Sequence, residues 1–275
     1  MRNMKVMLGV AALAAVVLGP MAMADTFILE DLNTTVVLDN STGSGMYEWD
    51  VEGVNHLSQQ WFWMRMGQDR EYRLDHSGGP VAANATDRDA SGQNDTLYLK
   101  YDYDLYTVEV TYMLTGGEIG SFTSDMAETI KITSRCQDAL DLHFFQYTDL
   151  DLNSTISDDT VELANTNKVE QRDALTMFSE TVVTPNPSRY EVNTWPSTLV
   201  KLEDDVASDL DNNDGPLTGD ATWAFQWDFV LGHYGDTFII SKDKLLTSTP
   251  IPAPGAVLLG ALGLWLVGRI KRRLA

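Results

Sequence analysis

Two acidic segments carry side chains of the kind that bind divalent cations. In the first, Asp149, Asp151 and Asn153 alternate at the end of a pattern typical of a β-strand. The second supplies the side chains of Asp209, Asp211, Asn213 and Asp214. Because Ca²⁺ accepts six to eight oxygen ligands in flexible geometry, both segments are candidate calcium sites.

The second segment does not match the EF-hand spacing. That pattern needs glycine at position six and glutamate at position twelve. Counting from Asp209, Gly215 is at position seven and Asp220 at position twelve. A non-EF calcium site stays open for both segments, and the alternative is that their acidic side chains only cap and close exposed turns.

No catalytic motif is recognisable in the sequence. The four histidines are scattered without HExxH spacing, and there is no Gly-x-Ser-x-Gly elbow or phosphate loop. His143 falls within an alternating strand pattern, which favours a hydrogen-bonded structural histidine. A carboxylate pair could act as in a glycosidase, but 40 acidic residues make such pairs too common to discriminate. We therefore assign no catalytic residue.

Tryptophans offer a second kind of chemistry, since exposed indole rings stack on sugars. Trp61 and Trp63 project from one face of their segment, as do Trp223 and Trp227. Aromatic residues in strands are more often core. For the period-two row Trp223, Phe225, Trp227 and Phe229 we predict a core face, because four exposed rings would form an unusually large apolar patch.

Strand-like patterns dominate the body of the chain. Apolar and polar residues alternate over 107–114, and Gly116-Gly117 then predicts a tight turn. Further candidate strands cover 59–66, 97–103, 126–133, 140–147, 176–183, 222–231 and 237–241. No apolar helical period of ten or more residues occurs between the two ends of the chain. The fold class predicted is all-β, an antiparallel two-sheet sandwich, with 75–95 as one long surface loop.

The first residues have the layout of a secretory signal peptide. Arg2 and Lys5 form a basic region, 6–18 is apolar, and Ala22-Met23-Ala24 is a small-x-small cleavage site before Asp25. We expect residues 1–24 to form a signal helix that signal peptidase removes. Cys136 is the single cysteine, so neither a lipoprotein anchor after this site nor an internal disulfide is expected.

The last residues have the layout of a C-terminal sorting signal. Pro252-Ala253-Pro254 precedes an apolar run from Ala256 to Gly268, with Leu264 and Trp265 near its end. The run is followed by the cations Arg269, Lys271, Arg272 and Arg273. A 13-residue helix spans about 20 Å against a hydrocarbon core of about 30 Å. We expect a short hydrophobic helix held transiently in the inner membrane, its cations cytoplasmic; the alternative is a permanent short anchor.

These features in this order resemble the PEP-CTERM sorting domain, which exosortase enzymes process in exopolysaccharide-producing Gram-negative bacteria. The resemblance covers residues 250–275 and implies an exosortase-like processing enzyme as a partner. The chain has Pro-Ala-Pro where the family has Pro-Glu-Pro. Parts of the body, such as 143–152 and 224–228, are similar to uncharacterised exported proteins that share this type of tail.

The remaining domain, residues 25–249, has a large excess of acidic over basic residues. Six of the 19 basic residues lie in the two ends, which leaves 13 against 40 acidic residues. Such a surface repels nucleic acid and anionic lipid and attracts divalent cations. The expected function is that of a non-catalytic surface or extracellular-matrix protein that binds exopolysaccharide. The alternative is a carbohydrate-active enzyme, a glycoside hydrolase or lyase, that uses a carboxylate pair.

Overall fold

The computed structural model describes residues 26–249. Over this range the all-β prediction is confirmed: two nine-stranded sheets account for nearly all regular structure. The exceptions are α1 (Ser197–Glu203) and the 3₁₀ turn η1 (Leu152–Ser154). Neither helix within 26–249 is long and apolar enough to cross a membrane. The predicted signal helix and C-terminal helix lie outside the described residues.

Sheet A is antiparallel apart from one short contact. Its order is β1 (Thr26–Asp31), β2 (Thr34–Asp39), β3 (Gly45–Val51), β5 (Leu57–Met66), β11 (Leu140–Leu150), β17 (Ala221–Leu231) and β15 (Arg189–Thr194). The short strands β4 (Val54–Asn55) and β6 (Tyr72–Arg73) pair with β3 and β5. The parallel contact joins the start of β3 to Gln60 of β5.

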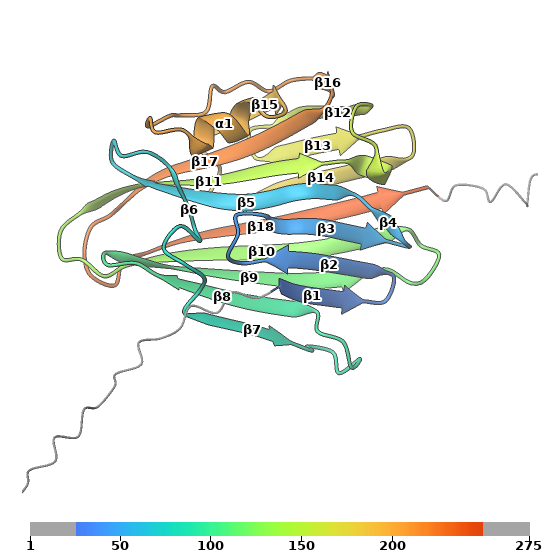
Figure 1. Ribbon diagram of the computed structural model, residues 1–275, viewed down its shortest axis with the longest axis horizontal. Coiled ribbons are helices and arrows are strands. Elements are labelled where there is room, and N and C mark those ends of the chain that lie inside the picture. The colour runs from blue at the N-terminus through green and yellow to red at the C-terminus, as the bar shows by residue number, and fades with distance from the viewer. Residues whose placement is uncertain (1–25, 250–275) are drawn as a thin grey trace, which may run out of the picture.

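Sheet B is antiparallel throughout. Its order is β16 (Leu217–Gly219), β12 (Asp159–Asn165), β13 (Lys168–Arg172), β14 (Thr176–Thr184), β18 (Thr237–Ser248), β10 (Thr123–Ser134), β9 (Tyr106–Gly116), β8 (Thr96–Asp102) and β7 (Ala82–Thr86). In Figure 1 the strands of both sheets run across the view in similar directions, and they succeed one another from α1 and β15 at the top to β1 and β7 at the bottom.

Two local predictions need correction. The range 75–95 is not a continuous loop, because β7 forms within it and pairs with β8. Gly116 is required for a close approach rather than for a positive φ: a Cβ there would lie 1.9 Å from the backbone oxygen of Asp31. The positive φ values in this connection belong to Gly120 and Phe122.

The predicted aromatic core is confirmed. Trp223, Phe225 and Trp227 are at most 1% exposed, and Phe229 stacks on Phe238 with ring centroids 3.9 Å apart. These rings fill the space between the sheets. Trp61 and Trp63 are also fully buried, so none of these four indole rings is available to stack on a sugar.

Four buried charged residues lie between the sheets. Lys242 and Lys244 of β18 pair directly with Glu128 of β10 and Glu180 of β14 respectively, and each lysine also reaches the other glutamate. All four are at most 1% exposed. The shortest diagonal ion pair, between Lys244 and Glu128, measures 2.6 Å.

Sheet A completes this network with two buried amides. Gln60 of β5 donates to Glu128 at 3.1 Å, and Gln146 of β11 donates to Glu180 at 2.9 Å. Each amide oxygen accepts from one of the two lysines. The two sheets are therefore joined by polar contacts inside an otherwise apolar core, where an unpaired charge would be costly.

We predict that Glu128→Gln destabilises the protein by about 3–5 kcal/mol, because it leaves two buried lysines with one carboxylate. Burial would raise the pKa of Glu128, but Lys242 and Lys244 outweigh it and lower the pKa to about 2. Since this lies below the unfolded value of about 4.3, the stabilisation is present above pH ~4 and is lost as the pH falls towards 2. Urea unfolding measures both effects.

Glu109→Gln is the control for this measurement. Glu109 pairs with Lys131 at 3.0 Å on the surface, with side chains 23% and 44% exposed. Loss of this surface ion pair should lower the free energy of unfolding by less than about 1 kcal/mol. Equal losses in the two variants would contradict the role given to the buried network.

Candidate functional site

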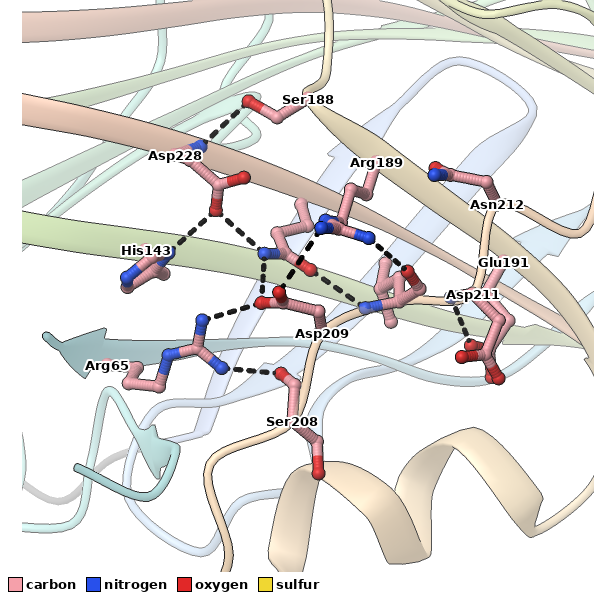
Figure 2. Close-up of polar contacts among 12 residues, drawn as sticks. Arg65, His143, Ser188, Arg189, Glu191, Ser208, Asp209, Asp211, Asn212 and Asp228 are labelled. Atoms are coloured by element: carbon pink, nitrogen blue, oxygen red, sulfur yellow. Dashed lines mark hydrogen bonds and ion pairs between the residues drawn. The ribbon is translucent and has the colours of Figure 1, made fainter. Parts of the chain in front are cut away.

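A polar network lies on the outer face of sheet A (Figure 2). Arg65 of β5, His143 of β11 and Asp228 of β17 are directly opposite one another in register. Directly paired residues point to the same face of a sheet. The segment after α1 adds Asp209, whose carboxylate lies 2.6 Å from Arg65 and also accepts from Gln226 at 2.8 Å.

His143 has the hydrogen-bonded position that its strand pattern predicts. Its Nδ1 lies 2.6 Å from Asp228, and its Nε2 is buried without a hydrogen bond among the described residues. Burial would raise the pKa of Asp228, but hydrogen bonds with His143 and Gln226 outweigh it and lower the pKa. A general acid or base must reach the reacting group. The buried Nε2 therefore favours a structural role.

Three potential metal ligands meet in this network. Donor atoms of His143, Asp209 and Asp228 lie within 4.8 Å of one another. Asp209, however, faces a guanidinium on each side, Arg65 at 2.6 Å and Arg189 at 3.4 Å. Two cations beside the same carboxylate oppose a metal ion. The network is better described as a clamp that holds the segment after α1 against sheet A.

The other residues of the second predicted calcium segment have separate partners. Asp211 pairs with Lys201 at 2.8 Å, and Asn213 donates to the backbone of Val192 at 2.6 Å. The backbone oxygen of Asp214 accepts from Leu163 at 2.9 Å. The side chains of Asp211 and Asn213 thus have different neighbours, and the contact of Asp214 is through its backbone. Calcium binding here stays a prediction.

In the first predicted segment the two aspartates are near each other and Asn153 is not with them. Asn153 donates to Asp173 and accepts from Thr176 at 2.9 Å. Asp149 is 6% exposed, and its carboxylate accepts no hydrogen bond from residues 26–249. Burial, and then the charges of Asp151, Asp220 and Asp159, raise the pKa of Asp149 to about 7. Calcium binding here also stays a prediction.

We predict that Asp149→Asn stabilises the protein above pH 7, by on the order of 1–3 kcal/mol. The folded pKa of Asp149 lies above its unfolded value, so wild-type stability falls as the pH rises from about 4 to about 7. The variant should lose this dependence and match the wild type below pH ~4. Urea unfolding across this range measures it, with exposed Asp138→Asn as the control. A variant no more stable than wild type at pH ~8 would contradict the assignment.

An aromatic cleft of about 550 Å³ lies between β5, β6 and the turn from β8 to β9. Figure 1 shows the chain around β6 running from β5 towards β8. The cleft residues that can contact a ligand include Tyr72, His76, Tyr103, Tyr106, Asp69 and Asp104. Its volume falls within the range of about 300–1,000 Å³ that is usual for ligand sites.

The rings in the cleft form a continuous row in which His76 and Tyr103 are stacked and the other pairs are tilted. His76 lies 5.5 Å from Tyr103 with an interplanar angle of 7°, and Tyr72 lies 4.9 Å from His76. Tyr106 lies 4.8 Å from Tyr103. Burial raises the pKa of Tyr106 to about 12, so this phenol keeps its proton at neutral pH.

Carboxylates stand beside these rings. Asp102 is paired with Lys100 at 3.7 Å and Arg135 at 3.5 Å. Asp69 and Asp104 have no side-chain partner within the described range 26–249, so both can accept hydrogen bonds from a ligand. Rings with adjacent hydrogen-bond acceptors suit a sugar, which has an apolar face and a hydroxyl edge.

Sequence reasoning did not identify this cleft. Its aromatic residues come from two segments, 72–76 and 103–106, that lie in different sheets. The available signal was Tyr103 and Tyr106 around the turn after an alternating strand. Nothing local indicated that His76 would stack on Tyr103.

Comparisons with known proteins show solved structures of similar fold, and they identify no family for this chain. No protein-family model matches the chain, and no curated protein matches it. Among solved structures, a bacterial glucoamylase in complex with acarbose has a TM-score of 0.55 at 8% identity, covering 88% of this chain. The chain spans only 36% of that glucoamylase.

Two shorter proteins match over their whole length. A putative aldose 1-epimerase from Escherichia coli K12 has a TM-score of 0.53 at 7% identity and covers 82% of this chain. The Slr1438 protein from Synechocystis has a TM-score of 0.53 at 8% identity and covers 88%. At such low identity these matches show a shared fold alone.

Proposed function

We propose that this is an exported, non-catalytic protein of the cell envelope or extracellular matrix that binds exopolysaccharide through the aromatic cleft. The observation that carries the proposal is the stack of Tyr72, His76 and Tyr103 beside unpaired carboxylates. The fold likeness to a glucoamylase and a putative aldose 1-epimerase supports a carbohydrate ligand. The strongly acidic composition argues against nucleic acid as the partner.

We predict that Tyr72→Ala with Asp104→Asn weakens polysaccharide binding at least about tenfold, as expected for the loss of a stacking ring and a hydrogen-bond acceptor. Calorimetry with exopolysaccharide fractions, guided by a glycan array with and without calcium, measures the affinity. Tyr72 is 37% exposed, so the fold should tolerate the change. Tyr234→Ala is the control, because Tyr234 is 64% exposed and outside the cleft. Equal binding by both variants would refute the cleft as the site.

The competing function is a carbohydrate-active enzyme. It is favoured by Asp149, whose pKa of about 7 suits a general acid or base near neutral pH. Asp151 and Asp220 are the nearby carboxylates that could act with it. Incubation with exopolysaccharide tests this alternative. It would be favoured if the wild type releases reducing ends or unsaturated sugars and Asp149→Asn does not.

The route to the envelope rests on the two ends of the chain. We propose that signal peptidase cuts after Ala24 and that an exosortase-like enzyme processes the tail after Pro252-Ala253-Pro254 has been presented at the inner membrane. The protein would then be transiently anchored before reaching the cell surface or the medium.

Intact-mass measurement tests this route. Mature protein from the envelope or medium should begin at Asp25 and lack the basic end, 269–275. Cells without the processing enzyme provide the control and should retain the tail. Mature molecules that mostly keep 269–275 would instead indicate a permanent anchor.

A further inference from the structure

The connection between β7 and β8 brings three carboxylates together. Donor atoms of Asp87, Asp89 and Asp95 lie within 4.8 Å of one another. Two of these residues are exposed and the third, Asp95, is buried. This group is separate from the aromatic cleft and from both acidic segments considered above.

Over its first nine positions the loop has the residue spacing of an EF-hand calcium loop. Counted from Asp87, aspartates occupy positions one and three, Ser91 position five and Gly92 position six, with Asp95 at position nine. EF-hand loops take ligands from positions one, three, five and nine and require glycine at six. Position twelve is Tyr98, within β8, so the bidentate glutamate is missing.

The backbone already has a closed conformation. Gly92 has a φ of +95° and donates to Asp87 at 2.7 Å. Ser91 donates its backbone N–H towards Asp87 at 3.1 Å and Asp89 at 2.9 Å.

Asp95 provides independent support for a ligand. Its side chain is 1% exposed, and its Oδ2 is buried without a hydrogen bond from any residue of the described range 26–249. Its Oδ1 already accepts from Arg88 N at 3.1 Å and Thr96 at 2.8 Å. An unsatisfied buried carboxylate oxygen is costly, and a cation would satisfy it.

Arg88 is the one basic residue of the described range that forms an ion pair with this oxygen, and it does not fill the site. Its Nε is 3.6 Å from Asp95 Oδ2, beyond hydrogen-bond distance. Its terminal nitrogen donates to Leu114 O at 3.1 Å and Thr115 at 3.3 Å, on β9. Three carboxylates and one guanidinium still leave two net negative charges for a divalent ion.

We propose that loop 87–95 binds one Ca²⁺ through Asp87, Asp89 and Asp95, with Ser91 and water completing the oxygen shell. Because the ligand at position twelve is missing, we expect weak binding, with a Kd of about 0.1–1 mM as in extracellular calcium modules. The end of the loop contacts both sheets: Asn94 O accepts a hydrogen bond from Glu30 N of β1 at 2.8 Å, and Asp95 O accepts one from Leu114 N of β9 at 2.8 Å. An ion that orders the loop would therefore stabilise this margin of the sandwich. This proposal is independent of the sugar cleft.

Calorimetry of the full, chelator-treated chain with CaCl₂ tests the proposal. In about 0.15 M salt, where diffuse charge attraction is screened beyond about 8 Å, the wild type should bind one equivalent. Asp87→Asn with Asp89→Asn should weaken binding at least about tenfold, and both residues are exposed, so the variant should fold. Circular dichroism confirms folding, and calcium should raise the Tm of the wild type alone.

Glu118→Gln with Asp138→Asn is the matched control. It removes the same two charges from exposed positions outside all three acidic segments and should bind calcium like the wild type. Three results would overturn the proposal: no saturable heat up to about ten times the expected Kd, wild-type binding by the loop variant, or an equal loss in the control. The last result would indicate diffuse attraction to an acidic surface.

Discussion

The pairing of two lysines with two glutamates inside the sandwich is the constraint on which the rest of the structure depends. Lys242 and Lys244 are at most 1% exposed and have no access to water, so both must find carboxylates inside the protein. Glu128 and Glu180 come from the strands on either side of β18. A slip of one residue would turn both lysines to the outer face, and a slip of two would separate the charges from their partners. The network therefore specifies the register of three strands.

The same network also fixes how the sheets are stacked. Gln60 and Gln146 approach it from sheet A and contact both its lysines and its glutamates. Directional hydrogen bonds define a relative position more sharply than apolar contact, which is not directional. The largest fully buried side chains among the described residues are aromatic. The polar contacts select one arrangement in which these rings pack.

Fixing the sheets in this way decides which surfaces remain open to a ligand. On the outer face of sheet A, Arg65 and Gln226 hold the segment after α1 in place through Asp209 (Figure 2). The polar row there is consequently engaged in structure. At the margin near β6, the two sheets instead leave a cleft lined by rings from both layers. The proposed ligand site therefore lies at the margin.

Local patterns in the sequence predicted the aromatic core and eight of the eighteen strands among the described residues. Alternation along 107–114 and 222–231 depends on the two-residue period of a strand, which neighbouring segments do not change. The prediction of an apolar face through Trp223 and Trp227 was confirmed for the same reason. The segment 237–241 was predicted too short, because Lys242 and Lys244 look like surface residues until Glu128 and Glu180 are opposite them.

The sites were decided by tertiary structure. His76 and Tyr103 become neighbours only when the chain between β6 of sheet A and β7 of sheet B comes to lie beside the turn from β8 to β9, and Asp209 meets Arg65 across more than a hundred residues of chain. The composition determined that the domain would be acidic, and the two ends predicted its export. Contacts between distant strands decide which carboxylates form ion pairs, which stay unpaired and which cluster together. Those contacts follow from the packing of two whole sheets, and no short segment of sequence contains them.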